Sequence, residues 1–431
     1  MLYRFVKIMM TTGLRFFYRH LYVTGLENIP PKGPVIIIAN HASSLMDAAV
    51  LGILLKRQLF FFARGDVFVN KPVRAMLSWL HMMPVHQHTA GRHTLAANTN
   101  SFSEAQRILA NGGIIVFFPE STSHTDRQLW PFRKGVFRLA FQTAQASQFS
   151  FEITIVPVGI TYDHPVHART TAQVHVGEPL FLSHYTASYL DNTSATLLRI
   201  SKDAYERAHK KVLHINNKEH LAIAEQCLEL NRNNTGTHPT WKIASDKRLQ
   251  EERAICQFIN NATASEINQV KQEQAVYFDA LNKHGLDDTT FGRAASCSFA
   301  KPLLVWLGAP LFAAGALLNG LPILLARLVA DKKVKRIDFY TWVFVAFYTV
   351  LYLGWLITVG IVTAMLLGWQ FIFAVIPAII LTGLFSYYYI DWYNSYRNYR
   401  QLKRLSHEQR TRLNTLRDNV QKLTGQLATM S

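Results

Sequence analysis

The chain has 431 residues, and 45 Lys and Arg against 28 Asp and Glu give a formal net charge of +17 at pH 7. A hydrophobic fraction of 49% excludes a disordered basic protein. The charge excess favours phosphate-bearing partners: nucleic acid, anionic lipid headgroups or phosphorylated substrates. Three widely spaced cysteines, Cys227, Cys256 and Cys297, predict neither a zinc site nor a disulfide framework, and they fit a reducing compartment.

Residues 1–22 alternate basic and apolar side chains. On a helix, an approximate apolar face would be formed by Phe5, Ile8, Met9, Leu14, Phe17 and Leu21. This pattern predicts an amphipathic helix that either associates with a membrane surface or covers the core of the domain that follows. Charges break the apolar run and no small-residue cleavage site follows, so we do not expect a secretory signal.

Residues 23–185 alternate strand and helix patterns, which predicts an α/β domain with a central sheet. Strands are expected at 35–39, 58–63, 82–86, 114–118 and 154–162. Helices are expected at 45–55, 72–81, 101–110 and 135–145. A capping box from Ser101 to Glu104 marks the start of the third helix.

The first expected strand leads into a turn that carries Asn40 and His41, and Asp47 follows as the next helix begins. Histidine is the usual general base near neutral pH, and a nearby carboxylate can fix its tautomer and stabilise its cation. With Ser44 as N-cap, Asp47 could also complete a capping box. The sequence predicts that His41 and Asp47 are a base and its orienting carboxylate, acting on a hydroxyl group.

A second polar segment, residues 117–123, follows the strand expected at 114–118. Ligands of open α/β sheets usually lie at such strand ends. The side chains that could position a phosphate-bearing polyol belong to Glu120, Ser121, Thr122 and Ser123. A structural turn is the alternative for this segment. Arg133 follows closely and is a candidate phosphate ligand or part of a solvated basic surface.

The region from 186 to 300 is polar and helical, without a catalytic constellation. It is open whether this region is a helical insert, a partner surface or a lever to the segment that follows.

Residues 301–392 are long, apolar and almost free of charge. Two membrane spans are expected, at about 340–365 and 369–390, with aromatic residues gathered at their ends. Two such segments in tandem favour a phospholipid membrane as the partner and exclude nucleic acid.

The stretch 303–330 is interrupted by Pro310 and Pro322, and we expect it to be broken, re-entrant or in-plane. Basic residues at 332–336 and in the helical tail, residues 393–431, then lie on the cytoplasmic side. The chain is expected to be an integral membrane protein with its catalytic domain on the cytoplasmic face.

Residues 23–35, followed by Asn40, His41 and Asp47, resemble the start of the glycerolipid acyltransferase family. That family includes 1-acylglycerol-3-phosphate and glycerol-3-phosphate acyltransferases. Residues 120–123 resemble its Glu-Gly-Thr-Ser block, and residues 156–158 resemble its late Val-Pro-Val strand. The resemblance implies a mixed sheet flanked by helices and a substrate-site role for Pro157. It also implies acyl transfer from acyl-CoA or acyl-carrier protein to a glycerol hydroxyl in phospholipid biosynthesis, with no other cofactor and no metal.

Three positions depart from the family pattern. Five residues separate His41 from Asp47 where four are usual, which resembles the glycerol-3-phosphate or dihydroxyacetone-phosphate branch. His86 and Gln87 stand where an arginine is expected, and the candidate substitutes as phosphate ligand are Arg64 and Arg92. Ser121 replaces a glycine, which restricts the backbone at positive φ.

Two other classes of function remain. A hydrolase of lipid esters lacks support, because no Gly-x-Ser-x-Gly elbow is present. An inactive membrane scaffold with the same fold, or an acyltransferase for another lysophospholipid, stays open. The acyl chain length, the acceptor and the oligomeric state are not predicted.

Overall fold

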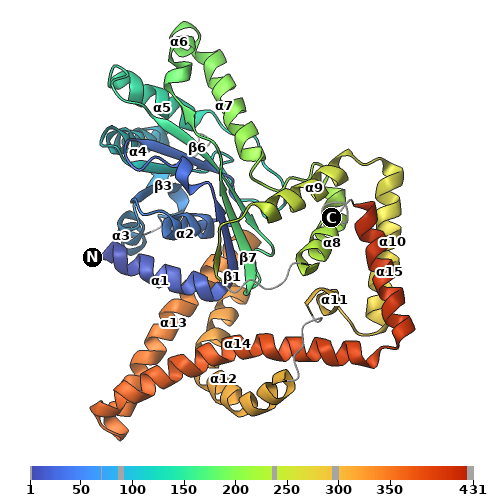
Figure 1. Ribbon diagram of the computed structural model, residues 1–431. Coiled ribbons are helices and arrows are strands. Elements are labelled where there is room, and N and C mark those ends of the chain that lie inside the picture. Colours follow the sequence, from blue (N-terminus) through green and yellow to red (C-terminus); the bar gives the residue numbers. More distant parts are fainter. Residues whose placement is uncertain (1, 69, 86–91, 235–239, 294–299, 425–431) are drawn as a thin grey trace. The chain divides into compact units, whose positions relative to one another are not determined.

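The computed structural model describes residues 2–68, 70–85, 92–234, 240–293 and 300–424 (Figure 1). The chain forms two compact units. The first unit comprises Met1–His214, Thr240–Leu249 and Ile337–Trp342. The second comprises Ile215–Pro239, Gln250–Arg336 and Val343–Ser431.

The first unit is built on a mixed sheet with the strand order β4-β3-β5-β2-β6-β7-β1-β9, and β8 pairs with β6. Its strands are β1 (Tyr18–Thr24), β2 (Val35–Ala39), β3 (Leu59–Arg64), β4 (Met82–Val85), β5 (Ile114–Phe117), β6 (Thr154–Tyr162), β7 (Thr170–Val176), β8 (Leu180–Phe181) and β9 (Lys242–Ile243). The strands from β4 to β6 run parallel, whereas β7 is antiparallel to β6. The predicted fold class, an α/β mixed sheet flanked by helices, is confirmed.

Strand β2 lies at the centre of the parallel part of the sheet and is buried along its whole length. It pairs with β5 on one side and β6 on the other. A parallel strand with both faces covered reads as a continuous apolar run, as Val-Ile-Ile-Ile-Ala does here. The carboxyl ends of β2, β5 and β6 therefore meet at one edge of the sheet.

The helices of the first unit are α1 (Leu2–Phe17), α2 (Leu45–Leu54), α3 (Lys71–Trp79), α4 (Arg92–Ala110), α5 (Gly135–Ala146), α6 (Ser183–Asp191) and α7 (Thr193–His209). Short 3-10 helices lie at Leu26–Asn28 and Gly65–Val67. Ile36 and Ile38 on one face of β2 share a buried core with Leu109 of α4, Phe137 of α5 and Ile200 of α7. Figure 1 shows α4, α5 and α7 packed along the sheet.

Two expected element boundaries are wrong. Helix α4 starts at Arg92, and Ser101 lies buried inside it and does not cap its start. The Ser-x-x-Glu spacing also occurs within a helix, where it has no capping function. The amino-terminal helix ends at Phe17, and the chain continues as β1. Pairing of β1 with β7 and β9 overrides the local helical pattern.

Helix α1 covers the core of its own unit with its carboxyl-terminal half. Leu14 and Phe17 are buried, and the Lys7 ammonium donates to the Leu55 carbonyl after α2. Ile8, by contrast, is 67% exposed. The structure favours the core-covering alternative for this half of α1.

The other helices are α8 (Leu221–Asn234), α9 (Lys247–Asn261), α10 (Ala264–Lys283), α11 (Thr289–Arg293), α12 (Ala300–Lys333), α13 (Ile337–Leu366), α14 (Ile372–Arg404) and α15 (His407–Leu423). Short 3-10 helices lie at Lys218–His220 and Trp369–Phe371. In the second unit α8, α10 and α15 share a core around Leu230, Tyr277 and Leu413. The Arg417 guanidinium donates to both carboxylate oxygens of buried Asp288, at 2.7 and 3.2 Å. The end of the basic tail is thus packed against the polar helical region.

Three helical segments, Pro302–Lys333, Ile337–Leu366 and Trp369–Arg404, are long and apolar enough to cross a membrane. The two spans predicted at 340–365 and 369–390 fall in the second and third of these segments, and Gly368 lies between them with a φ of 106°.

The expected break between 303 and 330 is wrong, because α12 stays helical through Pro310 and Pro322. Proline at 322 cannot donate to the carbonyl of Leu318, and this carbonyl accepts the indole N–H of Trp355 at 2.8 Å instead. A re-entrant or in-plane course of α12 stays a prediction.

Candidate active site

His41 and Asp47 meet at the carboxyl end of β2. His41 lies two residues beyond the strand, and Asp47 lies in the first turn of α2. The His41 Nδ1 atom is 2.8 Å from Asp47 Oδ2, with side-chain exposures of 19% and 0%. The predicted contact between this histidine and this carboxylate is present.

The Asp47 carboxylate is surrounded by donors. Oδ2 also accepts the backbone N–H of Ser43 at 2.9 Å, and Oδ1 accepts the hydroxyl of Tyr162 at 2.7 Å. Two assigned donors besides His41 suit an ionised carboxylate, which can only accept hydrogen bonds. The Nδ1 atom of His41 therefore carries its proton toward Asp47, and Nε2 keeps the lone pair that a general base needs.

The turn between His41 and α2 is held in an unusual conformation. Ser44, the N-cap of α2, has a φ of 46° and makes no capping hydrogen bond with its side chain. Asp47 accepts the N–H of Ser43, one residue before the N-cap, so the expected capping box does not form. A non-glycine residue at positive φ costs on the order of 1 kcal/mol, and such strain concentrates at functional sites.

Glu120 supports the backbone of this site. Its Oε2 accepts the N–H of His41 at 2.8 Å, and its Oε1 accepts the N–H of Trp130 at 2.9 Å. Burial raises the pKa of Glu120 to about 7, although both N–H groups act in the opposite direction. Both carboxylate oxygens accept backbone N–H groups, so the structure favours a positioning role of Glu120 on His41, and its direct contact with a substrate stays a prediction.

One aromatic ring and a backbone hydrogen bond complete the described surroundings of His41. The ring of Phe118 stacks on the imidazole, with centroids 4.1 Å apart and planes inclined by 15°. The N–H of His124 donates to the His41 carbonyl at 2.8 Å. The ring of His124 in turn stacks on Trp130 at 4.6 Å. The loop after β5 therefore fixes both the backbone and the ring of His41.

Two hydroxyl residues of the second motif, Thr122 and Ser123, contact protein groups. Thr122 Oγ1 lies 2.8 Å from Nε2 of His124. The Ser123 hydroxyl donates to the carboxylate of Asp338, the second residue of α13. Ser121 adopts a φ of 71°, the left-handed conformation that the family's glycine would take without strain.

Asn40 and Pro157 belong to the interior of the sheet. The Asn40 amide group donates to the carbonyl of Ile160 at 2.8 Å and accepts the N–H of Ile160 at 2.7 Å. Asn40 thereby continues the pairing of β2 with β6. Pro157 is buried within β6 opposite Ile38. These positions favour structural roles for both residues, and their direct contact with a substrate stays a prediction.

The candidate phosphate ligands differ in their surroundings. Arg64, at the end of β3, forms an ion pair with Asp66. Arg133 is exposed just before α5, and its N–H donates to the carbonyl of Pro119 at 3.0 Å. Arg92 begins α4, but its side chain lies outside the described part of the structure, as do His86 and Gln87. A phosphate contact by any of these arginines stays a prediction.

Sequence reasoning missed Tyr162, Phe118 and Asp338. Tyr162 ends the strand that was expected at 154–162, and its hydroxyl donates to Asp47. Its position at a predicted strand end is the feature of the sequence that could have marked Tyr162 as a site residue. Asp338 lies far from the motifs in the sequence, and no local pattern marks it. Among the described residues, no group of three or more His, Cys, Asp or Glu is placed to hold a metal ion.

Comparison with known proteins finds similarity to acyltransferases over the part of the chain that carries this site. Residues 20–161 match the family model described as Acyltransferase. Over 141 residues the chain is 26% identical to the chloroplastic 1-acyl-sn-glycerol-3-phosphate acyltransferase of Arabidopsis thaliana, covering 32% of this chain and 37% of that protein. Over 115 residues it is 26% identical to the 1-acyl-sn-glycerol-3-phosphate acyltransferase of Bacillus subtilis, covering 26% and 53%. Over 106 residues it is 30% identical to glycerol-3-phosphate O-acyltransferase 2 of Saccharomyces cerevisiae, covering 24% and 14%.

The matched segment thus spans between 14% and 53% of the lengths of these relatives. Among solved structures, the 1-acyl-sn-glycerophosphate acyltransferase of Thermotoga maritima is 22% identical with a TM-score of 0.35, covering 46% of this chain and 78% of that one. The family match includes His41, Asp47 and Glu120, whose geometry is described above. Through residues 20–161, the chain is similar to proteins of the glycerolipid acyltransferase family.

Proposed function

We propose that this protein transfers a fatty acyl group from an acyl-CoA or acyl-carrier-protein thioester to a hydroxyl of glycerol-3-phosphate or lysophosphatidic acid. The observation that carries the proposal is the His41–Asp47 pair at 2.8 Å, set in a segment of the acyltransferase family. The two acceptors are taken from the names of the plant, bacterial and yeast relatives.

His41 is the general base of the proposed reaction. Its Nε2 takes the proton of the acceptor hydroxyl while that oxygen attacks the thioester carbonyl carbon. Asp47 holds Nδ1 and stabilises the imidazolium that forms. The C–S bond then breaks, and the departing thiolate takes the proton from Nε2. One C–O bond replaces one C–S bond, and no covalent enzyme intermediate is required.

The turn after His41 supplies a candidate oxyanion site. Among the described residues of this turn, the N–H groups of Met46 and Asp47 donate to the carbonyls of Ser43 and Ser44. The N–H of Ser43 donates to Asp47. We therefore assign the oxyanion contact to the N–H groups of Ser44 and Leu45, at the start of α2. The positive φ of Ser44 sets the direction of these groups.

We propose that the enzyme is an integral membrane protein with its first unit on the cytoplasmic side. Three apolar helical segments of sufficient length support a membrane location. The basic segment 332–336 directly precedes Ile337–Trp342, which belongs to the first unit. Basic loops favour the cytoplasmic side, so the first unit would share that side with this segment.

The test is an acyl-transfer assay on the purified full chain in mixed micelles. Labelled acyl-CoA and acyl-carrier protein are offered with glycerol-3-phosphate, dihydroxyacetone phosphate, lysophosphatidic acid and other lysophospholipids. We expect a labelled ester with glycerol-3-phosphate or lysophosphatidic acid, and none with His41→Ala at equal protein level. Wild-type rates in that variant would refute the mechanism. Free fatty acid formed without an acceptor would indicate a hydrolase, and no product with any acceptor would indicate a scaffold.

A further inference from the structure

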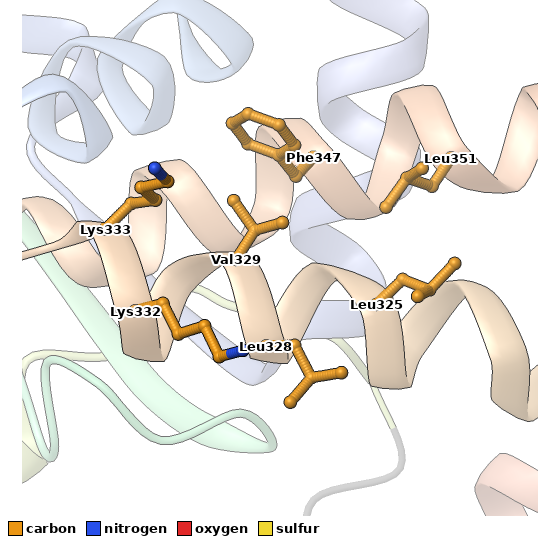
Figure 2. A pocket seen from close by; sticks show the side chains of 7 residues that line it. All are labelled: Leu325, Leu328, Val329, Lys332, Lys333, Phe347 and Leu351. Atoms are coloured by element: carbon orange, nitrogen blue, oxygen red, sulfur yellow. The ribbon is translucent and has the colours of Figure 1, made fainter.

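Helices α12 and α13 of the second unit enclose a groove of about 380 Å³ (Figure 2). Its lining residues are Leu325, Leu328, Val329, Lys332, Lys333, Phe347 and Leu351. This volume lies within the range of roughly 300–1,000 Å³ that small-molecule sites occupy.

The groove has a cationic end and an apolar end. Figure 2 shows Lys332 and Lys333 at one end and Leu325 and Leu351 at the other, with Val329 and Phe347 between them. Lysine side chains lay their methylene stems along apolar surface and keep the ammonium group in the polar interface. None of the seven described residues that line the groove is acidic, and the carboxylate of the neighbouring Asp331 lies 3.8 Å from Nε of Arg327.

The apolar side chains of the groove remain accessible. Leu325 is 41% exposed and Phe347 is 44% exposed. Both lie on helices that are long and apolar enough to cross a bilayer, where lipid would surround them. A ligand with an apolar chain and one anionic end matches a groove that has apolar side chains along its length and two lysines at one end.

We propose that this groove binds one anionic glycerophospholipid of the bilayer. Its phosphate lies at Lys332 and Lys333, and one acyl chain runs past Val329 and Phe347 toward Leu325 and Leu351. The site rests on the membrane location in the proposed function, but it goes beyond acyl transfer because none of its residues belongs to the His41 site.

The test measures lipid binding to the full chain by native mass spectrometry, in the His41→Ala background so that no turnover occurs. The probes are dioleoyl phosphatidic acid and dioleoyl phosphatidylcholine. We expect the protein to bind phosphatidic acid in preference to phosphatidylcholine. Combining Lys332→Gln with Lys333→Gln should lower the affinity for phosphatidic acid by about tenfold or more, because each basic residue near a lipid surface raises the affinity for anionic lipid severalfold. Equal affinities of the two lipids for the unsubstituted groove would overturn the proposal.

The matched control combines Lys335→Gln with Arg336→Gln, which removes the same charge from the same basic segment but outside the groove. We expect this variant to lose less affinity for phosphatidic acid than the Lys332→Gln, Lys333→Gln variant, because neither Lys335 nor Arg336 lines the groove. An equal loss in both double variants would mean that general surface charge attracts the lipid, and the proposal would fail.

A second pair of variants tests the apolar end. Val329→Trp fills the groove, whereas Leu317→Trp adds the same bulk at a position that is 81% exposed and outside the groove. Only Val329→Trp should abolish phosphatidic acid binding. Retained binding in Val329→Trp, or equal loss in Leu317→Trp, would contradict the site. Acyl transfer is measured separately in the His41 protein, so failure of the proposed reaction and failure of the groove give different results.

Discussion

The hydroxyl of Ser123 donates a hydrogen bond to the carboxylate of Asp338, although the two residues lie 215 positions apart in the chain. Asp338 is buried in the first turn of α13, within the first unit. Three residues on, the Thr341 hydroxyl donates to the carbonyl of Pro165. The loop that carries Glu120 and Ser123 is therefore hydrogen-bonded to the first turn of α13, a helix long and apolar enough to span a membrane.

Asp338→Ala should lower kcat/KM for the acceptor by about tenfold or more, because small displacements of a positioned loop weaken catalysis strongly. Asp338→Asn keeps an oxygen that can accept from Ser123 and should restore most of the rate. The measurement is acyl transfer at varied acceptor concentration. Asp331→Ala, a change of the same type near the end of α12, is the control. Equal effects of the alanine and asparagine variants at 338 would argue against positioning through this bond.

Tyr162→Phe should lower kcat by about tenfold while leaving the fold intact. The variant removes one of the three donors on Asp47, and a hydrogen bond to a charged group contributes about 1.5–3 kcal/mol. The matched control is Tyr185→Phe, since the Tyr185 hydroxyl also donates to a carboxylate, that of Asp203, at 2.7 Å. If both variants transfer acyl groups at the wild-type rate, the Tyr162 hydroxyl does not support Asp47.

The pH dependence of stability should report on Glu120. Because burial raises its pKa from 4.5 to about 7, the folded protein binds more protons than the unfolded chain between these values. This contribution is fully present below about pH 4.5 and is lost as the pH rises through about 7. Glu120→Gln, which does not titrate, should remove it.

Thermal unfolding of both proteins from pH 5 to 8 provides the measurement. The stability of the wild type relative to Glu120→Gln should fall as the pH rises, by at most about 1.4 kcal/mol per pH unit. A difference that stays constant, or grows with pH, would show that Glu120 is ionised throughout this range.

Ser121→Gly should raise the melting temperature, because Ser121 has a φ of 71° and glycine adopts this conformation without a clash of Cβ. We expect a gain on the order of 1 kcal/mol and no loss of acyl transfer. Ser147→Gly is the control, since Ser147 has a φ of −96° and glycine there relieves no strain. A lower melting temperature in Ser121→Gly would mean that the serine hydroxyl stabilises the loop more than its backbone strains it.

The sequence predicted the parallel part of the sheet because buried parallel strands read as apolar runs, as β2 and β6 do. Strands β1 and β7 were missed for a physical reason. Strand β7 buries polar residues, among them Gln173 and His175, and His175 Nδ1 lies 2.8 Å from the Thr24 hydroxyl of β1. In the sequence, such polar residues are typical of a loop. Their burial is explained only by the long-range strand pairing, which satisfies their hydrogen bonds.

At the site, proximity in sequence decided what could be predicted. His41 and Asp47 lie six positions apart, so their contact follows from one turn. Glu120 was recognised as a functional carboxylate, but its partners are backbone N–H groups, which leave no trace in residue types. The contact of Asp338 depends on the tertiary fold and could not be read from either segment alone.

The assignment of Ile337–Trp342 to the first unit has a practical consequence for obtaining a soluble enzyme. Truncation before residue 337 removes every apolar segment of α13 and α14, but it also removes Asp338 and Thr341, which bond to the loops at Ser123 and Pro165. The first unit thus includes residues 337–342, which are synthesised after α12, the first candidate span. Folding of the candidate active site would therefore finish only once α12 has been made. With the membrane location that we propose, maturation of the site would then be coupled to membrane insertion.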